Sequence, residues 1–376
     1  MKSLLVASRF PLPPYTGDRL RTLIWLEAMS ASTDLTLVCP PGNLGRSDVR
    51  HISARRSSAA FASSLARAGR SGLPMHALIA ANYDWRRALN DAGSDFDVAV
   101  VLLSRLDPWA FHEIHARRFV LDAIDSLAMS VAERARQARG PMRLFWKREV
   151  SRTATLEKDV ISRYDRIVVV SEEERALFGE RAIAVPNGVE IAPLDAPRRS
   201  YDFGFWGRLS YFANRDAARI LLDRLWPEIR RRCPRATLFI GGADAPDFVR
   251  DRDGSDGVTV ESPMNDRTQA LRSIRTALFP IRYGTGQSNK ILEAGEAGCA
   301  IVSTMAGVRG LEDLAAVSLV ADDERGIVDA ACSLFDEPSE AEAMGARLRS
   351  LVVANYDRRR SLQRLIEIVH EERSTP

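Results

Sequence analysis

The sequence predicts an α/β protein built from two doubly wound, Rossmann-like domains. The chain has 376 residues, which is more than one ordinary hydrophobic core contains and suits two domains. Its share of hydrophobic residues is 45% and its share of charged residues is 27%, and both values are typical of a globular protein. Short β-rich apolar runs alternate with helical patterns, which favours parallel sheets covered by helices. A turn-rich stretch at 186–197 divides the chain, and each half begins with a strand, a glycine-containing loop and a helix.

Apolar runs in the first half predict strands at 3–8, 34–40, 97–103, 119–125, 166–171 and 182–186. A helix is expected to start near Gly17, directly after the first of these strands. We therefore expect residues 1–190 to form an N-terminal domain.

The second half repeats this pattern, with strands expected at 201–206, 236–241, 258–261, 276–281, 299–303 and 318–321. Helical periodicity is clearest at 214–232 and 340–354. We expect residues 195–354 to form the C-terminal domain, and a last amphipathic helix at 357–372 to pack back on the N-terminal domain.

Charge and cysteine usage exclude several classes of protein. A net charge of +3 is close to balanced, so no nucleic-acid partner is expected. The apolar run at the start of the chain is too short for a signal peptide. The cysteines lie far apart, which argues against a zinc cluster or disulfide framework and favours a cytoplasmic protein: Cys39, Cys233, Cys299 and Cys332.

A ligand site is predicted where two strands of the second half end. In a doubly wound sheet of order 3-2-1-4-5-6, the strands at 201–206 and 276–281 are neighbours, and ligands bind outside their carboxyl ends. Gly207 and Arg208 follow the first of these strands, and a glycine-rich loop follows the second. Both should line one crevice.

The loop at 283–289 has the composition of an anion site. Gly284 and Gly286 would let backbone N–H groups approach a ligand, and the start of the following helix favours an anion. Lys290 on that helix and Arg208 add two positive charges, which suit a diphosphate.

Glu293 lies one turn beyond Lys290 on the same helix face. An acidic acceptor beside a phosphate site typically binds sugar hydroxyls, so the pattern predicts a nucleoside diphosphate with its ribose on Glu293. In the alternative interpretation, Lys290 and Glu293 form an ion pair on the protein surface, and the glycines belong to an ordinary turn between a strand and a helix. Lysine usage favours the site, because the chain has only four lysines: Lys2, Lys147, Lys158 and Lys290.

These residues resemble the donor-site signature of family 4 glycosyltransferases of the GT-B fold. The similar stretches are 280–286, 289–294, Gly298 and 300–304, and residues 13–17, 169–172, 186–189, 207–208 and Gly241 fall in the expected order. The ordered set covers nearly the whole chain. It also resembles the branch found in bacterial exopolysaccharide gene clusters.

The resemblance implies a retaining enzyme that moves a sugar from a nucleoside diphosphate sugar, with UDP or GDP as leaving group, to a glycan or lipid-linked acceptor. It implies no metal or other cofactor, and two facing domains with a deep cleft between them, the donor on the C-terminal one. The implied catalytic residues are Arg208, Lys290 and Asp125, and Gly17 and Asp18 would line the cleft from the N-terminal domain. The implied donor-site residues are Gly207, Arg208, Gly241, Met264, Gly284, Thr285, Gly286, Gln287, Ser288, Asn289, Lys290 and Glu293.

Three positions depart from the family pattern. Thr285 stands where the family often has the first of two glutamates, and Ile124 stands where relatives often carry a histidine before Asp125. The family's lysine shortly after 207–208 is absent from 210–215. Thr285 and Ile124 favour a second hypothesis, a nucleotide-sugar-binding scaffold subunit with little activity. A third is a nucleotide-sugar epimerase on the same fold, which would need acid and base residues around the sugar, and the sequence shows no such cluster.

A basic segment at 134–152 suggests a further partner. It holds seven basic residues and one acidic residue, Glu149, around Leu144, Phe145 and Trp146. A basic helix with embedded aromatic residues can lie on an anionic leaflet, which would bring the enzyme to a lipid-linked acceptor on the inner face of the plasma membrane. The alternative is a solvated helix face.

Overall fold

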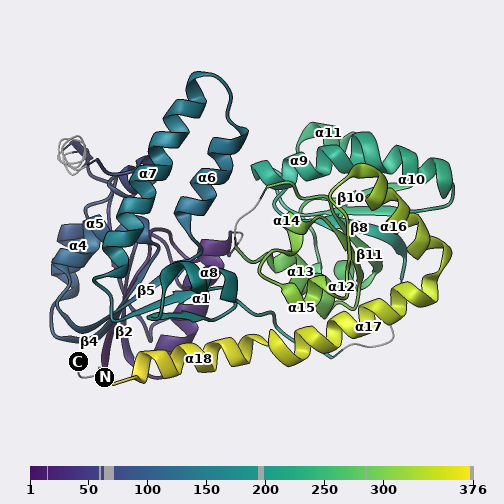
Figure 1. Cartoon of the computed structure of the whole chain (residues 1–376). Helices are drawn as coiled ribbons and strands as arrows, with labels where there is room; N and C mark the ends of the chain where they lie inside the picture. Colours follow the sequence, from purple (N-terminus) through teal and green to yellow (C-terminus); the bar gives the residue numbers. More distant parts are fainter. Residues whose placement is uncertain (15, 59–60, 63–71, 194–198, 284–285, 373–376) are drawn as a thin grey trace. The chain divides into compact units, whose positions relative to one another are not determined.

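The chain forms two compact units, one of residues 1–187 and 361–376 and one of residues 188–360 (Figure 1). The computed structural model describes all residues except 15, 59–60, 63–71, 194–198, 284–285 and 373–376, and it leaves out the side chain of Gln137. Each unit contains one parallel sheet with helices, so the expected α/β class with two Rossmann-like domains is confirmed.

The N-terminal sheet has seven parallel strands in the order β3-β2-β1-β4-β5-β6-β7. Its edge strand β3 was not predicted, because the sequence Arg50–Ser53 is short and polar and lies half-exposed at the edge. The expected strands are all present within three residues of their predicted starts. The strands are β1 (Lys2–Val6), β2 (Asp34–Cys39), β3 (Arg50–Ser53), β4 (Phe96–Leu102), β5 (Ala116–Ile124), β6 (Arg166–Val169) and β7 (Ala182–Ala184).

Helices cover both faces of this sheet, because successive strand residues point to opposite sides. Leu5 packs in one cluster with α1 and α18, whereas Leu4 and Val6 pack in another with α3, α4, α7 and α8. The helix α18 therefore packs on the N-terminal sheet, where Leu365 is fully buried. The helices are α1 (Gly17–Ser30), α3 (Met75–Ala80), α4 (Trp85–Ala92), α5 (Asp107–Ala110), α6 (Leu127–Gln137), α7 (Pro141–Ile161), α8 (Glu172–Phe178) and α18 (Arg358–His370), with 3₁₀ turns at Ser104–Leu106 and Phe111–Glu113.

The C-terminal sheet has six parallel strands in the order β10-β9-β8-β11-β12-β13, which is the predicted order 3-2-1-4-5-6. The strands are β8 (Tyr201–Trp206), β9 (Leu238–Gly241), β10 (Val258–Glu261), β11 (Ile274–Phe279), β12 (Ala300–Ser303) and β13 (Leu319–Val320). The helices are α9 (Phe212–Ile220), α10 (Trp226–Arg232), α11 (Asp247–Arg250), α12 (Arg267–Arg272), α13 (Asn289–Glu296), α14 (Met305–Val308), α15 (Glu312–Ala315), α16 (Glu324–Asp336) and α17 (Pro338–Asn355).

The helix predicted at 214–232 is not one regular α-helix. It starts at Phe212 and contains a π-helical segment at Leu221–Leu225 between α9 and α10. Pro227 follows this segment and has no backbone N–H to donate to the preceding turn, so the regular hydrogen-bond ladder is interrupted there.

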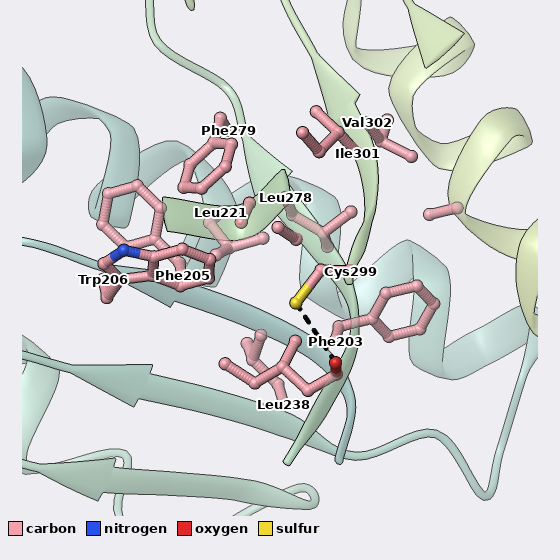
Figure 2. Close-up of a cluster of buried hydrophobic side chains, with 14 of the residues drawn as sticks. Phe203, Phe205, Trp206, Leu221, Leu238, Leu278, Phe279, Cys299, Ile301 and Val302 are labelled. Atoms are coloured by element: carbon pink, nitrogen blue, oxygen red, sulfur yellow. Dashed lines mark hydrogen bonds between the residues drawn. The ribbon is translucent and has the colours of Figure 1, made fainter. Parts of the chain in front are cut away.

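The core of the C-terminal unit fixes the end of strand β8. Figure 2 shows Phe203, Phe205 and Trp206 of this strand in one buried cluster with Phe279 of β11, whose ring contacts those of Phe205 and Trp206. The rings of Trp206 and Phe279 lie edge to face, 5.0 Å apart and at 77°. Because these side chains are fully buried, residues 207 and 208 emerge from a rigid strand end.

Candidate functional site

Gly207 and Lys290 meet at the carboxyl ends of β8 and β11, which are neighbours in the sheet. A Cβ atom added to Gly207 would lie 2.7 Å from Cε of Lys290. The lysine side chain therefore lies directly against the backbone of Gly207, and any larger residue there would have to displace the end of the lysine chain. The structure brings together two residues that were predicted from separate parts of the sequence.

The carboxyl ends of β8 and β9 approach closely because three residues there are glycines: Gly207, Gly241 and Gly242. Gly207 has φ +146° and donates its N–H to the carbonyl of Gly241 at 3.1 Å. A Cβ on Gly242, with φ +139°, would lie 1.8 Å from the Gly207 carbonyl oxygen. Met264 contacts the same corner, since its sulfur lies 2.6 Å from a Cβ built on Gly241. Gly207, Gly241 and Met264 thus lie side by side, and Gly242 joins them.

Lys290 lies half-buried on the first turn of α13. Burial lowers the pKa of its ammonium group to about 8, and the nearby positive charge of Arg267 acts in the same direction while Glu293 opposes it. The side chain is therefore charged at neutral pH, but less well solvated than a surface lysine. Such a cation favours an incoming anion.

Glu293 is held by two donors rather than by Lys290. Its Oε2 accepts a hydrogen bond from Nε1 of Trp206 at 2.8 Å and another from the guanidinium of Arg267. Within the residues that the structure describes, no ion pair joins Glu293 to Lys290 and no hydrogen bond reaches Oε1. The surface ion-pair interpretation is therefore wrong, and the carboxylate is oriented with one oxygen free to accept from a ligand.

Arg267 was missed by sequence reasoning. It lies on the short helix α12, 26 residues before Glu293, and belongs to no recognisable motif. Only the fold brings this helix beside α13.

Arg208 lies at the same edge, with its side chain 45% exposed. Its Nε donates to Oδ2 of Asp244 at 2.8 Å and to Ser210 at 3.2 Å. In the described part of the chain, its terminal nitrogens donate no hydrogen bond, so the planar fork remains available. Asp244 was not predicted; it holds the guanidinium at this strand end.

The loop before α13 is described only from Gly286 onward, because Gly284 and Thr285 lie outside the described residues. Gly286 has φ +71°, and Ser288 occupies the position before the helix without capping it through its side chain. Nε2 of Gln287 donates to the Gly310 carbonyl at 3.4 Å, while its buried Oε1 has no partner within the described chain. With Asn289 as its first residue, α13 starts without a side-chain cap, which leaves backbone N–H groups for an anion.

The N-terminal sheet carries the other predicted residues at its carboxyl edge. Gly17 and Asp18 begin α1, and Asp18 contacts Arg9 and Arg105. Asp125 follows β5 directly.

The backbone before Asp125 is strained. Ile124 has φ +65°, and the N–H of Asp125 donates to the carbonyl of Ala123 at 2.8 Å, which closes a three-residue turn. A β-branched residue avoids this conformation, so the surrounding structure must impose it. Asp122 does so: its Oδ1 accepts from the N–H of Ile124 at 2.9 Å.

Two buried glutamates hold the residues after this turn. The N–H of Ser126 donates to Glu174 at 2.8 Å, and the N–H of Leu127 donates to Glu157 at 2.6 Å. Burial raises the pKa of Glu174 to about 7, and the negative charge of Asp125 adds to that rise. Neither glutamate belongs to a sequence motif, so the sequence contained no signal for them.

The residues that the structure describes, drawn as ribbon in Figure 1, offer neither a metal cluster nor a membrane-spanning helix. These residues contain no group of three or more histidine, cysteine, aspartate or glutamate side chains arranged to hold a metal ion. Over the same residues, every helix is too short or too polar to cross a membrane.

Comparisons with known proteins address the fold and the C-terminal unit. Residues 200–337 match the sequence model of the family described as "Glycosyl transferases group 1". Sucrose-phosphate synthase (tll1590) from Thermosynechococcus elongatus superposes with a TM-score of 0.72 at 13% identity, over 98% of each chain. The chain has the GT-B fold. No curated protein sequence matches it.

Two other structures support this GT-B assignment. WaaG, a glycosyltransferase involved in lipopolysaccharide biosynthesis, has a TM-score of 0.66 at 14% identity, covering 99% of this chain and all of its own. Anabaena Alr3699/HepE, solved in complex with UDP and glucose, has a TM-score of 0.65 at 12% identity over 98% of this chain and 99% of that one. At such low identity the likeness establishes the fold.

Proposed function

We propose that this GT-B protein is a retaining, metal-independent glycosyltransferase of family 4, which transfers a sugar from a UDP-sugar or GDP-sugar to a glycan or lipid-linked acceptor in bacterial surface polysaccharide synthesis. The observation that best supports this function is the packing of Lys290 against Gly207, with Glu293 oriented one turn further along α13. The family match over 200–337 includes all three residues.

The proposed donor site lies at the carboxyl edge of the C-terminal sheet. Lys290, Arg208 and the start of α13 bind the diphosphate, and the free oxygen of Glu293 accepts from ribose hydroxyls. The two side-chain cations supply the charge that a metal ion supplies in other transferases. For this reason we propose that no metal is needed.

The reaction breaks the bond between the anomeric carbon and the phosphate oxygen. The acceptor hydroxyl oxygen bonds to that carbon on the same face, and its proton passes to the departing phosphate oxygen. Negative charge grows on the diphosphate as the bond breaks, and Lys290 and Arg208 stabilise it. In this proposal the N-terminal unit binds the acceptor, and Asp125 contacts the reacting groups from its strained turn.

Donor hydrolysis tests this function without knowledge of the acceptor. The protein is incubated with UDP-glucose, UDP-galactose and GDP-mannose in EDTA, and the products are followed by proton NMR. We expect slow release of one nucleotide and of a sugar whose first anomer keeps the α configuration of the donor. Nucleotide binding without turnover would instead indicate the scaffold subunit, and an altered sugar epimer without nucleotide release would indicate the epimerase.

We further propose that the hairpin of α6 and α7 contacts an anionic membrane from the cytoplasmic side. Figure 1 shows these helices in dark teal, with their joined ends pointing away from the N-terminal sheet. The start of α7 exposes Leu144 by 75%, Met142 by 52% and Phe145 by 38%. Apolar side chains surrounded by basic ones fit a bilayer with anionic headgroups. The nearby basic residues are Arg134, Arg136, Arg139, Arg143, Lys147 and Arg148.

Vesicle sedimentation tests the hairpin. We expect the parent to bind phosphatidylglycerol vesicles and not phosphatidylcholine vesicles. Replacing Arg143, Lys147 and Arg148 together by glutamine should weaken binding at least tenfold, since each basic residue contributes about 1 kcal/mol near such a surface. Leu144→Ser should also weaken it, whereas the control Leu177→Ser, which changes a leucine exposed by 50% on α8, should not. Equal binding by all variants, or none by the parent, would disprove the contact.

A further inference from the structure

Hydrogen bonds to two acidic side chains hold the backbone on both sides of Asp125. Before it, the N–H of Ile124 donates to Oδ1 of Asp122 at 2.9 Å. After it, the N–H of Ser126 donates to Oε2 of Glu174 at 2.8 Å. Ser126 is also the residue that caps α6, so Asp125 lies between a strained turn and a helix start. The direction of its side chain therefore depends on these two contacts.

The two glutamates at the start of α6 differ in how well their charge is compensated. Glu157 of α7 accepts from the hydroxyl of Ser126 at 2.9 Å. It also accepts from the backbone N–H groups of Leu127 at 2.6 Å and of Ala128 at 3.4 Å. Within the described residues, Glu174 of α8 accepts only the hydrogen bond from Ser126, although it is just 5% exposed. A negative charge on Glu174 is therefore poorly compensated.

The charged groups that act on Glu174 are negative: Asp125, Glu173 and Glu157. Helix α8 packs on β6 and β7. Of these strands, β6 carries only Arg166, which lies at its amino end and is already ion-paired, and β7 carries no charged residue. The first turn of α6 is also uncharged. Burial, together with these negative charges, raises the pKa of Glu174 to about 7, and its one backbone hydrogen bond opposes the rise.

An ionised Glu174 makes the fold less stable. The folded protein holds the proton of this carboxyl more tightly than an unfolded chain, in which the pKa of a glutamate is near 4.5. The free energy of unfolding therefore falls as the pH rises from about 4.5 to about 7, and the full cost remains above pH 7. A glutamine would accept the same hydrogen bond without this cost. A carboxylate that reduces stability beside a candidate catalytic residue is typical of a functional group.

We propose that Glu174 is a positioning residue for the transfer reaction, which holds Asp125 toward the reacting sugar and adds a negative charge beside it. This role rests on the proposed function, in which Asp125 contacts the reacting groups. Positive charge develops on the sugar as its bond to the phosphate breaks, and fixed negative charge nearby stabilises that state. Arg105, at the end of β4, interacts with Asp125 and offsets part of its charge. The charge of Glu174 counters that offset.

Donor hydrolysis tests this role in the full-length protein. The substrate is whichever of UDP-glucose, UDP-galactose and GDP-mannose the parent hydrolyses, kept at saturation so that the proton of Lys290 does not enter the profile. We expect kcat to rise about tenfold between pH 6 and pH 8, as Glu174 loses its proton near pH 7. In Glu174→Gln this rise should be absent, and kcat at pH 8 should be about tenfold lower or less. The KM for the donor should stay within about twofold, because the proposed donor site lies on the other unit.

A control variant and a melting experiment separate positioning from folding. Glu172→Gln changes a glutamate of the same helix whose side chain is 69% exposed, and it should keep the turnover and the pH profile of the parent. At pH 8, Glu174→Gln should unfold at a temperature no lower than that of the parent, since it removes the buried charge. A loss of turnover in this variant is then not a loss of folded protein.

The amide of Ser126 reports on Glu174 without any turnover. In protein labelled with ¹⁵N-serine, its NMR resonance is identified by its loss in Ser126→Thr, which keeps a hydroxyl group for Glu157. We expect the chemical shift of this amide to change in one step between pH 5.5 and pH 8.5, with its midpoint near pH 7. The step should be present in the parent and in Glu172→Gln and absent from Glu174→Gln.

The combined results distinguish this role from the proposed function. If the parent hydrolyses a donor and Glu174→Gln has the same kcat and pH profile, the positioning role is wrong while the transferase function stands. If the parent hydrolyses no donor but its Ser126 amide shows the step, the transferase function fails while the hold of Glu174 on the turn at Asp125 is supported. A parent without the step would overturn that hold.

Discussion

Lys290→Ala is expected to lose at least tenfold, and up to about 100-fold, in affinity for the nucleoside diphosphate. A charge-assisted hydrogen bond contributes about 1.5–3 kcal/mol, and each 1.4 kcal/mol is a factor of ten in affinity. The parent and the variant are titrated with UDP, GDP and ADP in EDTA by calorimetry. We expect one nucleotide to bind the parent with micromolar affinity, and its base identifies the base of the sugar donor.

The matched control is Lys158→Ala, which removes an exposed lysine of α7. It should bind the nucleotide like the parent. If Lys290→Ala also binds like the parent while its circular dichroism is unchanged, the phosphates do not lie at Lys290.

The same titration has an expected pH dependence. Without ligand, Lys290 loses its proton near pH 8, and a bound diphosphate raises the pKa of the ammonium group. Binding above pH 8 therefore takes up a proton, so affinity should fall between pH 8 and 9.5, approaching tenfold per pH unit. Below pH 8 the lysine is already charged and this effect disappears. In Lys290→Ala the fall should be absent.

Asp122→Ala is expected to cost the N-terminal unit about 3–5 kcal/mol, because it leaves the Arg21 charge buried without its partner. Both side chains have no exposed area, and Nε of Arg21 lies 2.6 Å from Oδ2 of Asp122. The variant also removes the acceptor for Nε1 of Trp25 and for the N–H of Ile124. We expect the melting temperature to fall by roughly 6–20 °C for a unit of this size.

Asp91→Ala serves as the control for this substitution. Its carboxylate is 62% exposed and lies 4.0 Å from Arg87, so its removal should change stability by less than about 0.5 kcal/mol. Equal melting temperatures for the two variants would show that the buried pair does not stabilise the unit.

Periodicity and turn composition predicted the fold in detail. Apolar runs marked every strand except β3, whose sequence Arg50–Ser53 lacks an apolar run. Pro227 explains why the predicted helix at 214–232 changes hydrogen-bond pattern. Strand order followed from the general rule for doubly wound sheets, which the C-terminal sheet obeys.

The candidate site was only partly predictable. Lys290 and Glu293 were found because they follow a glycine-rich loop at a strand end, where ligand-binding residues gather in such folds. Arg267, Asp244 and Glu174 were not found, because each contacts its partner across a gap of 26 to 48 residues with no motif. Long-range pairing of this kind leaves no local pattern.

The sequence by itself determined two α/β units and the loops that carry the candidate site, because these depend on local periodicity and turn chemistry. Together with the general rule for doubly wound sheets, it also determined the order of the C-terminal strands. Tertiary structure decided the state of each side chain. In the folded chain Lys290 packs against Gly207, Glu293 accepts a hydrogen bond from Trp206, and Ile124 has φ +65°. Such burial, charge pairing and strain arise only when distant segments pack together, which is why no single stretch of sequence reveals them.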